Sequence, residues 1–180
     1  MATGALDRPI TFANNDLPGI MSLSAATEYL GRYGVLVGQE IAILSNNTTA
    51  KAAAPLLEAA GAKVRHLDAA KVTANGVGSK YVTAVSYGNA RHQCDTLLAT
   101  GGLTPIVHLW RHAGGKLAWD EAKAAFVPGN GPDGMIAVGA ANGTFDLDHA
   151  MEEGLVAGRG EQPVRQAGTY HVTPLWPKPG

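Results

Sequence analysis

The sequence predicts an α/β fold with parallel strands, and three observations support this prediction. An apolar strand at 40–44, an Ala/Leu-rich helix at 49–60 and a second strand at 63–67 follow one another with only tight turns between them. This order is typical of a right-handed βαβ unit. The 180 residues include 23 glycines and are 46 % hydrophobic, which suits many sharp turns around an apolar core.

The segment before the βαβ unit is predicted to hold a loop and one helix. Residues 11–20 are rich in Asn, Asp, Pro and Gly, a composition typical of loops. Apolar residues then recur at helical spacing over 22–33. Ser22 or Ser24 is the candidate N-cap of this helix, and Gly34 is the expected stop.

After the βαβ unit the sequence predicts mainly strands. Residues 72–87 are expected to form a β-hairpin that turns at 76–78, because β-branched residues follow a glycine-rich turn. Short apolar runs at 95–100 and 135–138 indicate two further buried strands.

The C-terminal part is expected to contain one helix and a tail. Asp146 or Asp148 is the candidate N-cap of a helix that runs to Ala157. Helical periodicity ends after this point, and 162–180 contain four prolines. We therefore expect residues 159–180 to form an extended tail.

Composition disfavours several classes of function. The net charge is −1 with Lys and Arg scattered, which does not favour a nucleic-acid partner. No apolar run is long enough for a membrane span, and residues 1–9 lack a signal-peptide pattern. The single cysteine, Cys94, cannot form an intramolecular disulfide or a C-x-x-C pair. A reduced, cytoplasmic setting is expected.

The turn after the first strand of the βαβ unit occupies the place of a dinucleotide fingerprint. Two of its three glycine positions hold Ser45 and Asn47, and Ala50 fills the third. Asp68, at the end of the second strand, stands where an acid would bind a ribose. Because the two larger side chains would crowd a pyrophosphate, we favour a scaffold that has lost its ligand over a nucleotide site.

A second candidate site follows the predicted strand at 135–138. Residues 139–143, with sequence GAANG, lead into the C-terminal helix. Small residues before a helix N-terminus leave N–H groups free to bind a phosphate or ribityl group. A plain strand-to-helix connection is the alternative, and the sequence does not decide between them.

Catalytic and metal-binding residues are not expected. His108 and His112 have an i,i+4 spacing, but the segment that holds them ends in two glycines, and His149 lies far along the chain. Surface or hydrogen-bonded histidines are the preferred interpretation. Cys94 lacks a local base and is interpreted as a small buried residue. The chain has no G-x-S-x-G elbow.

Several spaced motifs resemble the α subunit of heterotetrameric sarcosine oxidase over about residues 2–158. They are ATGALDRP at 2–9, TFANND at 11–16, PGIM at 18–21, RYGV at 32–35, SNN at 45–47, CDTLL at 94–98, PIVHL at 105–109, AGGKL at 113–117 and GAANG at 139–143. The resemblance implies a fold like that of flavin-dependent disulfide reductases, in which one dinucleotide-binding domain interrupts another. Residues 1–12 would end the outer domain, 13–104 would be the inserted Rossmann-like domain, and 105–158 would return to the outer domain.

The resemblance also implies a site and an activity. The outer domain would hold a non-covalent NAD rather than FAD, with the expected contacts Thr3, Gly4, Gly139, Ala140, Asn142 and Gly143. The full enzyme would oxidise sarcosine to glycine with oxygen and tetrahydrofolate, yielding hydrogen peroxide. This chain would be a component of that hetero-oligomer rather than a catalyst by itself. Its partners would be the other subunits or the missing parts of the α subunit.

The sequence departs from the family pattern in three places. The upstream G-x-G-x-x-G motif and the folate-binding part are absent, and the stretch between Asp68 and Val72 is short. A fragment, a split gene product and a decayed copy all fit these departures. Two other functions stay open: an α-type subunit of an opine, proline or glycine dehydrogenase, and a non-catalytic scaffold that binds no nucleotide.

Overall fold

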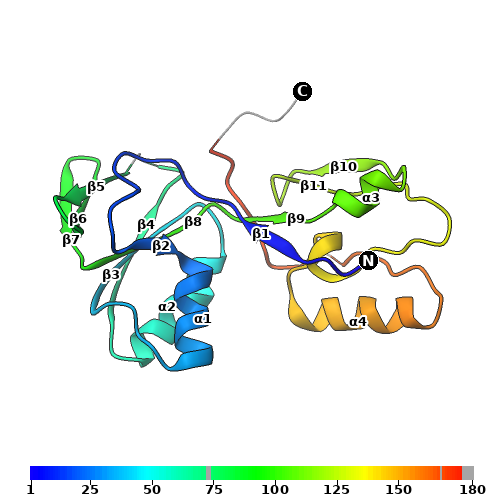
Figure 1. Cartoon of the computed structure of the whole chain (residues 1–180), viewed down its shortest axis with the longest axis horizontal. Coiled ribbons are helices and arrows are strands. Elements are labelled where there is room, and N and C mark those ends of the chain that lie inside the picture. Colours follow the sequence, from blue (N-terminus) through cyan, green and yellow to red (C-terminus); the bar gives the residue numbers. More distant parts are fainter. Residues whose placement is uncertain (72–73, 167, 176–180) are drawn as a thin grey trace. The chain divides into compact units, whose positions relative to one another are not determined.

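A computed structural model describes residues 1–71, 74–166 and 168–175, and the chain divides into two compact units (Figure 1). Residues 7–102, together with the described residues from 173 onward, form one of them, here called the sheet unit. Residues 1–6 and 103–172 form the other, here called the loop unit.

A parallel sheet of four strands organises the sheet unit. Its strand order is β2 (Ile20–Ser22), β8 (Thr96–Thr100), β3 (Glu40–Ser45) and β4 (Lys63–Asp68). The helix α2 (Thr49–Ala59) connects β3 to β4, so the βαβ unit predicted from the sequence is confirmed. The predicted α/β fold class with parallel strands is therefore also confirmed.

Both faces of this sheet are covered by apolar packing. The helices α1 (Leu23–Tyr33) and α2 pack on one face, around a core that includes Ile41, Ile43 and Leu98. On the other face Leu44 and Leu97 pack with residues of a second, antiparallel sheet. That sheet has the order β5 (Ala74–Gly78), β6 (Val82–Tyr87) and β7 (Ala90–Gln93).

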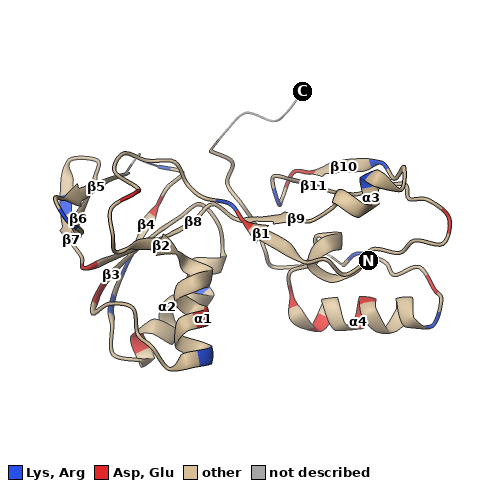
Figure 2. Ribbon diagram, in the orientation of Figure 1, with Lys and Arg blue, Asp and Glu red and all other residues tan. Residues whose placement is uncertain are grey.

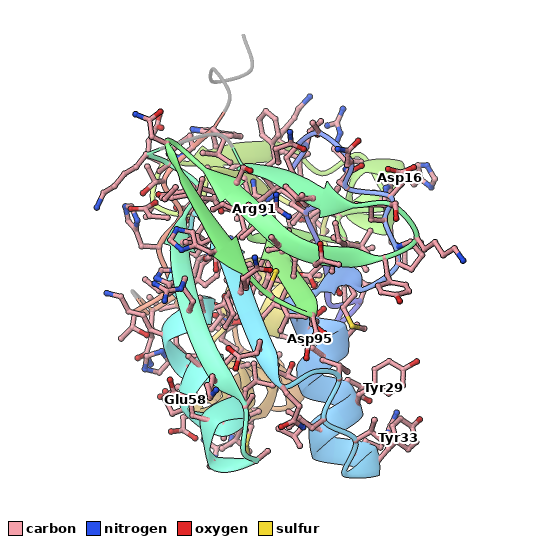
Figure 3. All side chains as sticks on the ribbon, turned by 90° about the vertical axis from the view of Figure 1, so that its left-hand side faces the viewer. Asp16, Tyr29, Tyr33, Glu58, Arg91 and Asp95 are labelled. Atoms are coloured by element: carbon pink, nitrogen blue, oxygen red, sulfur yellow. The ribbon has the colours of Figure 1, made fainter. Side chains whose placement is uncertain are left out.

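The ends of α1 follow the sequence signals. The Ser22 hydroxyl accepts a hydrogen bond from the backbone N–H of Ala25, which makes Ser22 the N-cap. Gly34 ends the helix with a φ of 66°, in the left-handed region that favours glycine. Figure 3 shows Tyr29 and Tyr33 projecting outward from this helix, away from the core.

Two strand predictions were inaccurate. The expected hairpin turn at 76–78 lies inside β5, and β7 adds a third strand to the sheet; residues 72–73 of the predicted segment lie outside the described residues. Residues 135–138 form no strand. Their hydrogen bonds go to the chain terminus instead: the Met1 amino group donates to the Ile136 carbonyl, and the Val138 N–H donates to the Met1 carbonyl.

The loop unit is built from short elements. Strand β1 (Ala5–Asp7) pairs with β9 (Leu103–Pro105), and β10 (Leu117–Asp120) pairs with β11 (Ala125–Pro128), a hairpin that the sequence analysis missed. The helices are α3 (His108–His112), the 3₁₀ turn η1 (Gly139–Asn142) and α4 (Leu147–Gly158). The helix expected after Asp146 is thus present.

The segment predicted as an extended tail contains no helix or strand in its described residues, but part of it packs onto the loop unit. Val172 is fully buried, and its N–H donates to the Ala122 carbonyl at 2.9 Å. The Tyr170 hydroxyl accepts a hydrogen bond from the Leu103 N–H at 2.6 Å. In the described part of the chain, every helix is too short or too polar to cross a membrane.

Candidate functional site

The turn after β3 in the sheet unit is closed by its own side chains. Ser45 and Asn46 are buried. The Asn47 N–H donates to the Ser45 Oγ at 3.1 Å, and the Asn47 Oδ1 accepts the N–H of Thr49 at 3.0 Å. The Asn47 Nδ2 also donates to the Thr100 carbonyl at the end of β8, at 2.9 Å. These N–H groups, which a glycine-rich turn would offer to a phosphate, are therefore already bonded.

Further contacts cover the same turn. The Asn46 Nδ2 donates to the Thr173 carbonyl, and the Thr173 N–H donates to the Asn46 carbonyl, each at 2.8 Å. Asp68 accepts the Ala70 N–H at 3.0 Å and lies 3.4 Å from the ammonium of Lys71. The residues at this turn do not fit a pyrophosphate, since the Ser45 and Asn47 side chains already bond the N–H groups of Asn47 and Thr49.

The 139–143 loop of the loop unit has a different construction. Gly139 and Gly143 have φ angles of 63° and 83°, which are strained for other residues. A Cβ on Gly143 would lie 2.7 Å from the Val127 side chain, so the loop packs closely on β11. A Cβ on Gly139 would meet only the Ala150 methyl, at 3.6 Å. The backbone at Gly139 is thus the more accessible of the two.

A buried carboxylate holds this loop in place. Glu153, on α4, is only 2 % exposed. Its oxygens accept hydrogen bonds from the Gly139 N–H at 2.7 Å, from the Asn142 Nδ2 at 3.3 Å and from the Thr144 hydroxyl. We call Glu153, Gly139, Asn142 and Thr144 the Glu153 cluster. The carboxylate lies against the first N–H of η1, where an anion is favoured.

Arg165 completes the surroundings of the loop. Its Nη2 donates to the Asn142 Oδ1 at 2.8 Å and to the Pro128 carbonyl at 2.9 Å. Burial lowers the pKa of this guanidinium, while the charges of Asp120 and Glu153 act in the opposite direction. Both ends of the Asn142 amide are therefore used inside the protein, one by Glu153 and one by Arg165.

The N-terminal residues lie on the same unit. The Thr3 hydroxyl donates to the Ile106 carbonyl at 2.6 Å, and the Gly4 carbonyl accepts the Ile106 N–H at 3.0 Å. Gly4 has a φ of 80°, and a Cβ built on it would meet no atom within 4 Å. Met1 is hydrogen-bonded to Ile136 and Val138, which directly precede the 139–143 loop. The N-terminal segment that contains Gly4 is therefore linked to the start of that loop through Met1.

The six residues expected to bind a cofactor thus fall into two groups. Thr3, Gly4, Gly139 and Ala140 are half-buried and keep some contact with solvent. Asn142 and Gly143 are buried and engaged in packing or hydrogen bonds.

Sequence reasoning missed Glu153 and Arg165. A signal for Glu153 was present, because Ala150 and Ala157 place it on a helix face of small residues. A charged residue on such a face needs buried partners. Arg165 lies in a segment without periodicity, where the sequence offers no comparable signal.

The other candidates show no site. His108 and His112 are exposed on α3, and no group of three or more His, Cys, Asp or Glu residues in the described ranges could hold a metal ion. Cys94 is buried in the core of the sheet unit, and burial, followed by the charge of Asp95, raises the pKa of its thiol to about 11. Such a thiol is not an active nucleophile at neutral pH.

Comparison with solved structures shows a shared fold. L-proline dehydrogenase from P. horikoshii matches 90 % of this chain with a TM-score of 0.67 and 23 % identity, over 34 % of its own length. Thioredoxin reductase from T. acidophilum, matched over 62 % of its length, and an NAD-dependent persulfide reductase from A. fulgidus, matched over 38 %, each cover 88 % of this chain at 16 % identity, with TM-scores of 0.60. At these identities the likeness concerns the fold alone.

Sequence comparison points to one kind of protein. No family model matches the chain. The sarcosine oxidase subunit alpha of Rhizobium meliloti (strain 1021) is 36 % identical over 93 % of the chain, and that of Corynebacterium sp. (strain P-1) is 33 % identical over 88 %. The chain spans 19 % and 20 % of these relatives' lengths. The resemblance seen in the sequence is confirmed: the chain is related to one segment, about a fifth, of sarcosine oxidase α subunits.

Proposed function

We propose that the chain is the dinucleotide-fold segment of a sarcosine oxidase-like α subunit, and that its loop unit contributes to an NAD site. The supporting observation is the 36 % identity over 93 % of the chain. In this proposal the sheet unit is the inserted domain expected at 13–104, and the loop unit is part of the outer domain. In this proposal the segment helps to bind and position the NAD, and it carries no catalytic side chain.

The more accessible residues of the loop unit support the proposed location of the NAD site. Gly4 offers open backbone with a positive φ. Gly139 starts the 3₁₀ turn η1 and is half-buried, with its N–H bonded to Glu153. Thr3 and Ala140 are half-buried beside them in sequence. We propose that these four residues touch the cofactor, whereas Asn142 and Gly143 shape the loop from inside.

We propose a scaffold role for the sheet unit. The turn at Ser45 and Asn47 bonds its own N–H groups, so a dinucleotide would have to displace partly buried hydrogen bonds to enter. This observation favours a nucleotide-free fold in this unit. It also argues against the alternative in which Asp68 binds the ribose of a nucleotide.

A calorimetric titration of the whole chain with NAD, and separately with FAD, tests the proposal. We expect saturable NAD binding and a weaker response to FAD. Gly4→Leu places a side chain in the open space above the backbone and should weaken NAD binding about ten-fold or more. A thermal melt of the variant checks that the loop unit still folds.

Asp68→Asn is the matched control, since it removes the charge of the alternative ribose acid and keeps its shape. NAD affinity should stay the same in this variant. Loss of binding in Asp68→Asn with no change in Gly4→Leu would move the site to the sheet unit and overturn the proposal. Absence of any NAD or FAD binding would leave both units as scaffold.

The reaction of the assembled enzyme is part of the same proposal. We propose oxidation of sarcosine to glycine with oxygen and tetrahydrofolate, by a complex in which other polypeptides carry the chemistry. The alternative substrates are opines, proline and glycine. Amine-dependent oxygen consumption and reduction of an artificial electron-acceptor dye, both measured on the complex purified with its natural partners and with each amine in turn, distinguish them.

A further inference from the structure

Helix α4 exposes an apolar stripe. Leu147, Met151 and Leu155 follow one another at intervals of four residues and are 73 %, 65 % and 59 % exposed. Residues at this spacing lie on one face of a helix. Three large apolar side chains in a row on one exposed face are unusual for a surface helix and are typical of an interface.

The polarity of α4 is inverted compared with the other long helices. Its fully buried residue is Glu153, whereas α1 buries Leu23 and α2 buries Leu57. Gly154 and Gly158 lie next to the stripe, and a Cβ on either would meet no atom within 4 Å. The outer face of α4 therefore combines apolar side chains with open backbone that a neighbouring element could approach closely.

Acidic residues border the stripe. Asp148 and Glu152 are exposed and lie one turn apart on its flank, and Figure 2 shows acidic positions along α4. Glu152 accepts a hydrogen bond from the neutral Gln166 side chain at 2.7 Å, which leaves its charge in place. No Lys or Arg occurs between Leu147 and Gly158, and the first basic residue after them is the exposed Arg159 at the C-cap, one turn beyond Leu155.

We propose that the outer face of α4 is a docking surface for a polypeptide element that presents an apolar stripe with a basic rim. A second copy of this chain would bring Asp148 and Glu152 against the same acidic residues, and an anionic lipid surface would be repelled in the same way. The relatives carry about four-fifths of their length outside the matched segment, so polypeptide to cover the stripe is present in them.

This inference rests on the part of the proposed function that places the chain in a larger protein, and it does not depend on NAD. The contact is a helix-in-groove or helix-on-helix contact, in which the three apolar residues supply affinity. The acidic flank selects a partner with Lys or Arg beside its apolar positions.

Titration of the full chain with two synthetic helical peptides tests the surface. Both peptides have about 18 residues, roughly five turns, and the same leucine stripe. One has a lysine rim and the other a glutamate rim. We expect the lysine-rim peptide to bind at least about ten-fold more tightly than the glutamate-rim peptide. Met151→Gln with Leu155→Gln should weaken its binding by a further factor of about ten or more.

Leu56→Gln is the matched control, because Leu56 is 60 % exposed on α2 of the sheet unit. This variant should bind the lysine-rim peptide as the parent chain does. Equal binding of the two peptides, or no effect of the α4 double variant, would overturn the proposal. Concentration-dependent dimerisation that the double variant abolishes would assign the stripe to a second copy instead, and binding to phosphatidylglycerol vesicles would assign it to lipid.

The outcomes of the peptide experiment and the NAD experiment are independent of each other. A chain that binds the lysine-rim peptide but not NAD keeps the docking surface and loses the proposed cofactor site. A chain that binds NAD but neither peptide keeps the cofactor site and loses the docking surface.

Discussion

The two units of this chain differ in what they bury. Two apolar clusters fill both faces of the parallel sheet in the sheet unit, and side chains such as Ile43, Leu97 and Leu98 are fully buried there. The loop unit buries the carboxylate of Glu153 with Asn142 and Thr144, while α4 exposes its large apolar residues. The sheet unit thus combines two apolar clusters with neutral buried polar residues such as Ser45, whereas the loop unit combines buried apolar residues such as Val127 and Val172 with a buried charged residue, Glu153.

This difference matters for function because the two kinds of interior respond differently to change. An apolar core tolerates many substitutions of similar volume. A buried polar cluster requires every partner, since an unsatisfied group costs its full desolvation penalty. A loop held by such a cluster has a defined backbone conformation, which a binding site requires.

The largest expected effect is a difference in the free energy of unfolding between two leucine variants, one in each unit. Leu98 is fully buried between the sheet and its helices, so Leu98→Ala should lower the free energy of unfolding by about 2 to 5 kcal/mol. Leu155, which is 59 % exposed on α4, should change it by less than about 0.5 kcal/mol when replaced by Ala. Urea unfolding followed by circular dichroism measures both. Equal losses would mean that the outer face of α4 is covered in solution.

The next effect concerns the Glu153 cluster. Glu153→Gln replaces a carboxylate that accepts three hydrogen bonds with an amide that has one oxygen, so at least one donor loses its partner. We expect a loss of about 2 kcal/mol, together with faster hydrogen exchange at the Gly139 amide. Glu152→Gln, on the adjacent exposed position, should leave both quantities nearly unchanged. If the two variants behave alike, the cluster does not hold the loop.

The sheet unit was largely predictable because its signals are local. The alternation of an apolar strand, a tight turn, an Ala/Leu-rich helix and a second strand over 40–68 is confirmed. The helix cap at Ser22 and the stop at Gly34 also appear where the sequence places them. In this unit burial and backbone propensity favour the same structure, so each segment can be assigned without knowing its neighbours.

The loop unit was less predictable because its contacts are long-range. Residues 135–138 have the composition of a strand, but Ile136 and Val138 are hydrogen-bonded to Met1, at the start of the sequence. Arg165 reaches Asn142 across 23 residues of sequence. Periodicity cannot reveal such pairs, since they depend on which distant segments meet. The roles of Thr3 and Gly4 came only from the resemblance, and they stay a prediction until NAD binding is measured.

The smallest expected effect tests whether water reaches Cys94 in the core of the sheet unit. Burial raises the pKa of the Cys94 thiol from 9.0 to about 11, so the folded chain keeps its proton over a range in which the unfolded chain loses it. The stabilising contribution is therefore complete below pH 9 and decreases as the pH rises from about 9 to 11. The contribution lost between pH 9 and pH 11 is on the order of 1 to 2 kcal/mol. The pH dependence of unfolding free energy should be flatter over this range in Cys94→Ala than in the parent chain.

The comparison between the two proteins removes the contribution of the Tyr and Lys side chains that titrate in the same range. Equal slopes would mean that water reaches Cys94, and the core around this residue would then be less closed than its burial indicates.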